Sequence, residues 1–193
     1  MRRPDALPDG RRSARGVWRS IRFHHLSRFI VDNDVVTTDQ LTAGGLRVWL
    51  AGHDPVTGEE RGHHRLSPDA DLVLDGTLNQ PKSNSIGALL HTELAGESEA
   101  LQGLLRDRIL LRWQTELNAR RCHGGLLREK TTRIEVVELQ HRRSRALEPH
   151  IQRHVWLNIN VLGADGKWSN RDSRVAVTAF RLAPLAQRTE GLR

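Results

Sequence analysis

The chain has 193 residues, of which 37% are hydrophobic and only 4% aromatic, and it carries a formal net charge of +7. This length suffices for one domain with a modest, mostly aliphatic core. A single cysteine, Cys122, cannot form an internal disulfide. No apolar run approaches the roughly 20 residues of a membrane-spanning helix, and no apolar signal-peptide region follows the basic N-terminus. We therefore expect a soluble, cytoplasmic protein with no membrane partner.

The positive charge comes almost entirely from arginine, because lysine occurs only at Lys82, Lys130 and Lys167. Arginine suits phosphate recognition, since its planar guanidinium can donate two parallel hydrogen bonds. A basic surface of this kind favours a polyanionic partner such as nucleic acid. A GC-rich coding sequence would produce the same arginine bias, and the composition alone leaves both explanations open.

The first half of the chain predicts one strand and three helices after a disordered basic lead at residues 1–15. A helix is expected near residues 38–50, capped by Thr37 or Thr38. Residues 71–79 alternate as a half-buried strand, with Asp75 on its polar face. Pro81 ends that strand, Ser83 or Ser85 caps a short helix to about residue 94, and a long helix covers residues 98–122.

The second half predicts strands at residues 132–141, 150–162 and 167–173, with a hairpin turn at Asp165-Gly166 between the last two. This order of elements predicts an α+β fold, with helices on the apolar face of an antiparallel sheet and polar side chains on the other. We expect a basic, poorly patterned segment at residues 1–50, a domain at 51–177 and a tail at 178–193.

The clearest strand carries candidate metal ligands. Gln152 and His154 are two residues apart, so they share a face about 6.6 Å apart, and His141 would come from the neighbouring strand. His150 lies about 13 Å from His154 along the same strand, too far to share an ion without a bulge. Imidazole and amide donors suit Mn²⁺, Mg²⁺, Ni²⁺ or Zn²⁺, but this spacing alone is common and weak evidence.

The same segment resembles the metal motif of conjugative relaxases of the TrwC/TraI (MobF, HUH) family. His141, Ser144-Arg145, Glu148-Pro149 and His154 match that motif, whereas Gln152 stands where the family has its middle histidine. Two further segments resemble the family in order: the loop Asp54-Pro55-Val56-Thr57-Gly58, and the strand from Asp75 to Pro81-Lys82-Ser83. The resemblance covers about residues 53–174.

The resemblance implies an antiparallel HUH-type palm that processes plasmid DNA during conjugation. It implies a divalent metal (Mg²⁺ or Mn²⁺, or Zn²⁺ or Ni²⁺) held by His141, His154 and, weakly, Gln152, with Asp75 as an assisting carboxylate. The expected partners are single-stranded DNA at the transfer origin and proteins of the transfer complex. The residues expected to contact DNA are Lys82, Ser83, Arg142, Arg143, Arg145, Arg153, Trp156 and Arg171.

The chain departs from the family at the nucleophile. These relaxases attack DNA with a tyrosine near the N-terminus, and the 193 residues contain none. Ser20 and Ser27 stand near that region, but a serine alkoxide is far less accessible than a phenolate. We expect a relaxase-like domain that binds DNA without nicking it, as in a truncated or rearranged copy. An active nickase with an unusual nucleophile, or one completed by another chain, and a non-enzymatic His-rich metal-binding or regulatory module are the alternatives.

Overall fold

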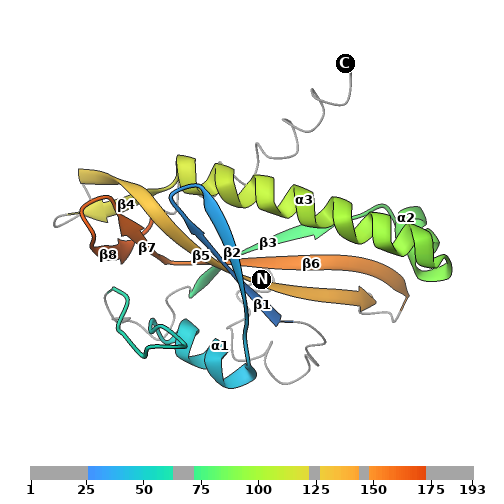
Figure 1. Cartoon of the computed structure of the whole chain (residues 1–193), viewed down its shortest axis with the longest axis horizontal. Coiled ribbons are helices and arrows are strands. Elements are labelled where there is room, and N and C mark those ends of the chain that lie inside the picture. The colour runs from blue at the N-terminus through green and yellow to red at the C-terminus, as the bar shows by residue number, and fades with distance from the viewer. Residues whose placement is uncertain (1–25, 63–71, 122–126, 144–147, 173–193) are drawn as a thin grey trace, which may run out of the picture.

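A computed structural model describes residues 26–62, 72–121, 127–143 and 148–172, and the side chain of Arg143 is not described. Within these residues the chain forms one eight-stranded sheet and three helices (Figure 1). Their bounds, in chain order, are β1 Leu26–Asp32, β2 Val35–Gln40, α1 Ala43–Leu50, β3 Val73–Asn79, α2 Lys82–Leu90, α3 Thr92–Glu116, β4 Asn118–Arg121, β5 Leu127–Arg143, β6 Pro149–Asn158, β7 Asn160–Gly163 and β8 Trp168–Asn170.

Strand β5 is the longest strand and lies at the centre of the sheet. It has 17 residues and pairs with four strands: β4 at residues 127–130, β7 at 131–133, β1 at 133–139 and β6 at 136–143. The main path runs β2-β1-β5-β6-β3, and each of these neighbours is antiparallel. The antiparallel sheet and three helices confirm the predicted α+β class.

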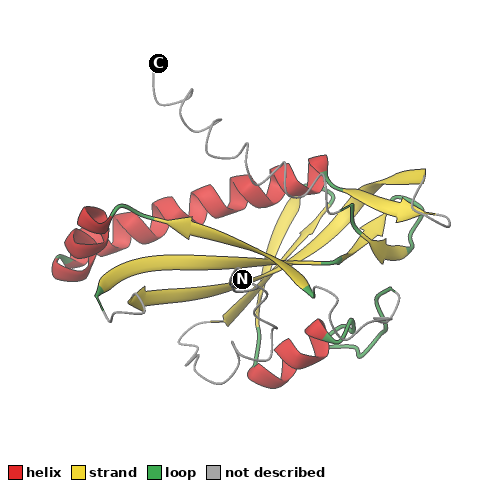
Figure 2. Ribbon diagram, turned by 180° about the vertical axis from the view of Figure 1, so that it is seen from behind, coloured by secondary structure: helices red, strands yellow, loops and turns green. Residues whose placement is uncertain are grey.

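Helices α2 and α3 cover one face of this sheet, and α1 lies on the other side (Figures 1 and 2). The larger core forms beneath α3, because alternate strand residues and one helix face bury their apolar side chains together. Its members are Phe29, Val31, Ile109, Leu110, Trp113, Leu117, Ala119, Ile134, Val136, Val155, Leu157 and Val161.

A smaller core lies under α1 on the opposite face. Leu46 and Trp49 of α1 pack there against Leu26, Val137 and Leu139. The helix begins after Thr42, whose hydroxyl accepts a hydrogen bond from the Gly45 N–H at 3.0 Å. The expectation that helices pack on one face only is therefore incomplete, since α1 covers part of the second face.

The structure corrects several predicted boundaries. Residues 35–40 pair with β1 as a strand, so the predicted helix at 38–50 is shorter and its cap is Thr42. The short helix α2 begins after Pro81 without a side-chain cap, so neither Ser83 nor Ser85 caps it. The long helix ends at Glu116 because the next residues pair with β5 as β4.

Two more corrections concern the sheet itself. The predicted strand at 150–162 divides into β6 and β7, where the Asn158 side chain accepts a hydrogen bond from the Asn160 N–H at 2.9 Å. Residues 26–50 supply β1, which pairs with β5 along its whole length, so the expected boundary at residue 50 cuts through one sheet. The hairpin turn is confirmed, with Gly166 at φ 73° between β7 and β8. No helix among the described residues is long and apolar enough to span a membrane.

Candidate metal and nucleic-acid site

Three neighbouring strands bring the predicted site residues onto one face. His141 of β5 pairs directly with Gln152 of β6, and Asp75 of β3 pairs with Trp156, two residues from His154. Directly paired and alternate residues share a face of an antiparallel sheet, so all four polar side chains point to the same side. That side is the one that α2 and α3 leave uncovered (Figure 2). The strand parity predicted for Asp75 and His154 is therefore correct.

The side chains themselves meet. The Nδ1 atom of His154 lies 3.1 Å and 3.2 Å from the two carboxylate oxygens of Asp75. The rings of His141 and His154 are nearly perpendicular, at 85°, with centroids 5.3 Å apart. When His154 donates its Nδ1–H to Asp75, its Nε2 carries the lone pair that a metal needs. Asp75 thus orients the His154 ring so that its Nε2 can bind a cation.

The donor set suits an open and weakly held divalent cation. Within the described residues, no three His, Cys, Asp or Glu side chains gather as a metal cluster. The available donors are the imidazoles of His141 and His154 and the amide oxygen of Gln152, with Asp75 behind His154. Such a set does not make the closed four-ligand site typical of structural zinc, and it leaves coordination positions for other ligands.

The predicted phosphate contacts at the start of α2 are accessible. Lys82 and Ser83 are exposed, and the Lys82 ammonium lies 2.7 Å from a carboxylate oxygen of Glu148. Hydrogen bonding and attraction from Lys82 lower the pKa of Glu148. Arg142 is exposed near the end of β5. Arg145 and the side chain of Arg143 lie outside the described residues.

Two of the residues expected to contact DNA, Arg153 and Arg171, have buried side chains in this structure. Arg153 is 2% exposed and donates to Gln102 at 2.6 Å and to Glu138 at 2.7 Å, and it also pairs with Glu99. It stands between Gln152 and His154 on β6, so it points to the opposite face, beneath α3. Arg171 is 7% exposed and donates its Nε–H to the Asn158 carbonyl at 3.2 Å.

Trp156 has a packing role in this structure. It is half-buried and packs against the small core under α1, two residues after His154 on the same face of β6. Its position on the site face agrees with the strand pattern.

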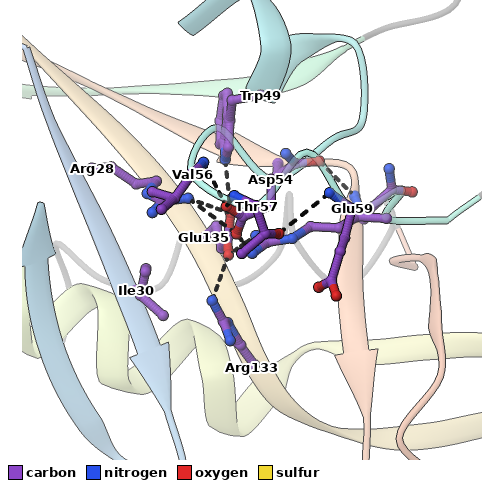
Figure 3. A network of polar contacts seen from close by, with 12 residues as sticks. Arg28, Ile30, Trp49, Asp54, Val56, Thr57, Glu59, Arg133 and Glu135 are labelled. Carbon is purple, nitrogen blue, oxygen red and sulfur yellow. Dashed lines mark hydrogen bonds and ion pairs between the residues drawn. The ribbon is translucent and has the colours of Figure 1, made fainter. Parts of the chain in front are cut away.

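A buried charge cluster beside the small core was not predicted (Figure 3). Glu135 of β5 is 1% exposed and accepts hydrogen bonds from the Trp49 indole N–H at 3.0 Å, from Arg133 at 3.1 Å and from Arg61. A guanidinium nitrogen of Arg28 lies 3.8 Å from the same carboxylate. One acidic side chain therefore joins α1, two strands and the loop that follows α1.

Asp54 completes this cluster from that loop. It pairs with Arg61, and its Oδ1 accepts the Val56 and Thr57 N–H groups at 2.7 Å and 2.9 Å. Burial, followed by repulsion from Arg133 and Arg28, lowers the pKa of Arg61 to about 10. The Asp-Pro-Val-Thr-Gly motif indicated a tight turn. A guanidinium nitrogen of Arg28 on β1 also lies 3.7 Å from Asp54, and Arg28 is too far away in sequence for any local pattern to identify it.

Comparisons with known proteins agree with this geometry. The family model for the TrwC relaxase matches residues 11–188. Among solved structures, a copper-bound TrwC relaxase with oriT DNA is 22% identical with a TM-score of 0.65, covering 82% of this chain and 55% of that one. A metal-free TrwC complex with oriT DNA is 20% identical with a TM-score of 0.66, covering 82% and 57%.

A third structure is TrwC with a 27-mer DNA comprising the recognition hairpin and cleavage site, at 22% identity and a TM-score of 0.63, covering 76% of this chain and 52% of that one. The chain therefore spans little more than half of the solved relatives. A comparison with curated proteins finds no match. The family model covers most of the sequence, and the described residues have the relaxase fold, so this chain belongs to the TrwC relaxase family.

Proposed function

We propose that this chain is a relaxase-type domain that binds single-stranded transfer-origin DNA and does not itself cut it. The observation that carries this proposal is the hydrogen bond between His154 and Asp75, with the His141 ring beside it, on the face of the sheet that α2 and α3 leave uncovered. An imidazole oriented by a carboxylate, with a second imidazole beside it, is an arrangement suited to a metal ion that binds a phosphate ligand.

A divalent cation would be held by His141, His154 and the amide of Gln152. When bound, it would polarise a phosphate oxygen of the DNA backbone. Asp75 would fix the ring and tautomer of His154 through the Nδ1–H bond. The amide of Gln152 is a weaker donor than an imidazole, which supports a weaker metal site than three histidines would make.

The DNA backbone would lie along the exposed positive groups around this face. Lys82 stands at the beginning of α2, where backbone N–H groups also favour anions, and Arg142 lies next to His141 on β5. The solved TrwC relatives contain oriT DNA, which supports the same class of ligand here. Binding by such contacts weakens as salt rises, because neutralised phosphates release counterions.

Cleavage as in the family would need a tyrosine nucleophile, and these 193 residues contain no tyrosine. We therefore propose binding without strand transfer unless another polypeptide supplies the attacking group. We also propose that the protein acts in the cytoplasm, with proteins of the transfer complex as candidate partners.

The test is fluorescence anisotropy of a labelled single-stranded origin oligonucleotide, titrated with the full chain at two salt concentrations. We expect salt-dependent binding that is tighter than binding to the matched duplex. Incubation of the same complex with Mn²⁺, followed by a denaturing gel, should show an intact oligonucleotide and no covalent adduct. Absence of single-strand binding at low salt would refute the proposal, and tight metal uptake without DNA binding would favour a metal-binding or regulatory module instead.

A further inference from the structure

The outer side of α3 carries a row of exposed leucines. Leu94, Leu101 and Leu104 are 47%, 52% and 53% exposed, and their separations of seven and three residues place them along one side of the helix. The residues that α3 buries face the sheet from the opposite side: Gln102, Ile109, Leu110, Trp113 and Gln114. Helix α3 is therefore apolar on two sides, although only one of them contacts the larger core.

Charged residues flank these leucines with opposite signs at the two ends. Glu97 precedes Leu101 by four residues, and Arg108 follows Leu104 by four residues. In the same way, Glu93 precedes Leu101 by eight residues and Arg112 follows Leu104 by eight residues. Glu93, Glu97 and Arg108 are exposed, and the Arg112 side chain is 40% exposed beside Glu116. The acidic and basic halves are thus symmetric about a point between Leu101 and Leu104.

We propose that this row, the α3 outer stripe, pairs with the α3 outer stripe of a second copy of the chain in antiparallel orientation. A two-fold axis between Leu101 and Leu104 would set each Leu101 against Leu104 of the second copy. The same axis sets each Glu97 against Arg108 of the second copy and each Glu93 against Arg112. A two-fold interface requires this reciprocity, and antiparallel helices also oppose their dipoles favourably.

The arrangement is compatible with the proposed DNA site. Helix α3 covers one face of the sheet (Figures 1 and 2). The strand register places His154 and Asp75 on the other face, so pairing through α3 leaves the proposed DNA site of each copy accessible. One helix side per copy buries less than the roughly 1,600 Å² of a standard interface. The dimer should therefore be weak, with a dissociation constant of about micromolar or higher. Its charge pairs are exposed, so association should weaken at high salt.

The test is sedimentation velocity of the full chain over a concentration series. The wild type should show a reversible monomer–dimer equilibrium. Leu101→Asp should abolish the dimer. The control is Val56→Asp, which puts the same charge at an exposed apolar residue (78%) outside α3 and should leave the dimer unchanged. Circular dichroism would establish that each variant is folded.

Two charge reversals identify the partner as a second copy. Glu97→Arg and Arg108→Glu should each weaken self-association about tenfold or more, because each places like charges opposite one another. An equimolar mixture of these two variants should form a heterodimer, since both charge pairs are then restored. A wild-type chain that stays monomeric, an association insensitive to Leu101→Asp, or a mixture that does not associate would overturn the proposal.

Discussion

Replacing Glu135 with glutamine removes the central negative charge of the buried cluster while keeping the volume of the side chain. The carboxylate is 1% exposed and faces three guanidiniums, those of Arg61, Arg133 and Arg28. At about 4 Å and an effective dielectric constant near 20, each such pair contributes about 4 kcal/mol of gross attraction. Desolvation of the ions offsets much of this attraction in the wild type.

The variant keeps the desolvation cost of the guanidiniums and loses their attraction to the carboxylate. Breaking a buried pair by removing one partner typically costs about 3–5 kcal/mol, because an uncompensated charge stays buried. The glutamine oxygen can still accept from the Trp49 N–H, so we expect the lower end, a loss of about 3 kcal/mol in the free energy of unfolding. This is a large part of the roughly 5–15 kcal/mol that stabilises a typical domain.

Urea unfolding followed by tryptophan fluorescence measures this loss. With a urea dependence of about 2 kcal/mol/M, the unfolding midpoint should fall by about 1.5 M. Glu59→Gln is the matched control, because Glu59 is exposed on the same loop that the cluster holds, and its midpoint should hardly change. A loss for Glu135→Gln of less than about 0.5 kcal/mol would refute the role given to this carboxylate.

Four further outcomes follow from the site and the hairpin. Gln152→His should raise Mn²⁺ affinity at least about tenfold in calorimetry, since an imidazole replaces an amide beside His141; unchanged affinity would contradict the proposed ligand set. Asp75→Asn should lower Mn²⁺ affinity about 10- to 100-fold, whereas replacing His91, an exposed histidine between α2 and α3, with alanine should not. Lys82→Ala should reduce the salt slope of single-strand binding by about 0.7, and an unaltered slope would exclude this phosphate contact. Hydrogen bonding from Arg121 lowers the pKa of Asp165 from 3.8 to about 2, so its support of the β7–β8 hairpin is present above pH 4 and lost as pH falls towards 2. Amide exchange should show that pH-dependent loss in the wild type and none in Asp165→Asn.

The site face was predictable because strand alternation is a strong local signal. The alternation of β6 placed Gln152 and His154 together, and that of β3 placed Asp75 on the same side. The same alternation puts Arg153 on the buried side, beneath α3. The positive charge of Arg153 predicts a DNA contact, whereas its strand parity predicts the buried position that the structure shows.

The buried cluster could not be predicted in the same way. Glu135 lies on a strand between apolar neighbours, and its partners Trp49 and Arg61 are 86 and 74 residues away in sequence. Local patterns give no information about such pairs, because only the folded sheet brings them together. The boundaries of α1 and α3 were wrong for a different reason. Strand β2 pairs with β1 and β4 pairs with β5, the strands next to them in the chain, and these pairings occupy residues that the helical pattern had included.

The most direct test of the proposed function compares the effect of Mn²⁺ on single-strand affinity in the wild type and in His154→Ala. The measurement is anisotropy of the labelled origin oligonucleotide at one salt concentration, with and without the metal. The wild type should bind more tightly with Mn²⁺, and His154→Ala should keep its metal-free binding while losing that increase. An equal Mn²⁺ effect in both proteins would contradict the account, because the metal would then act somewhere other than at His154.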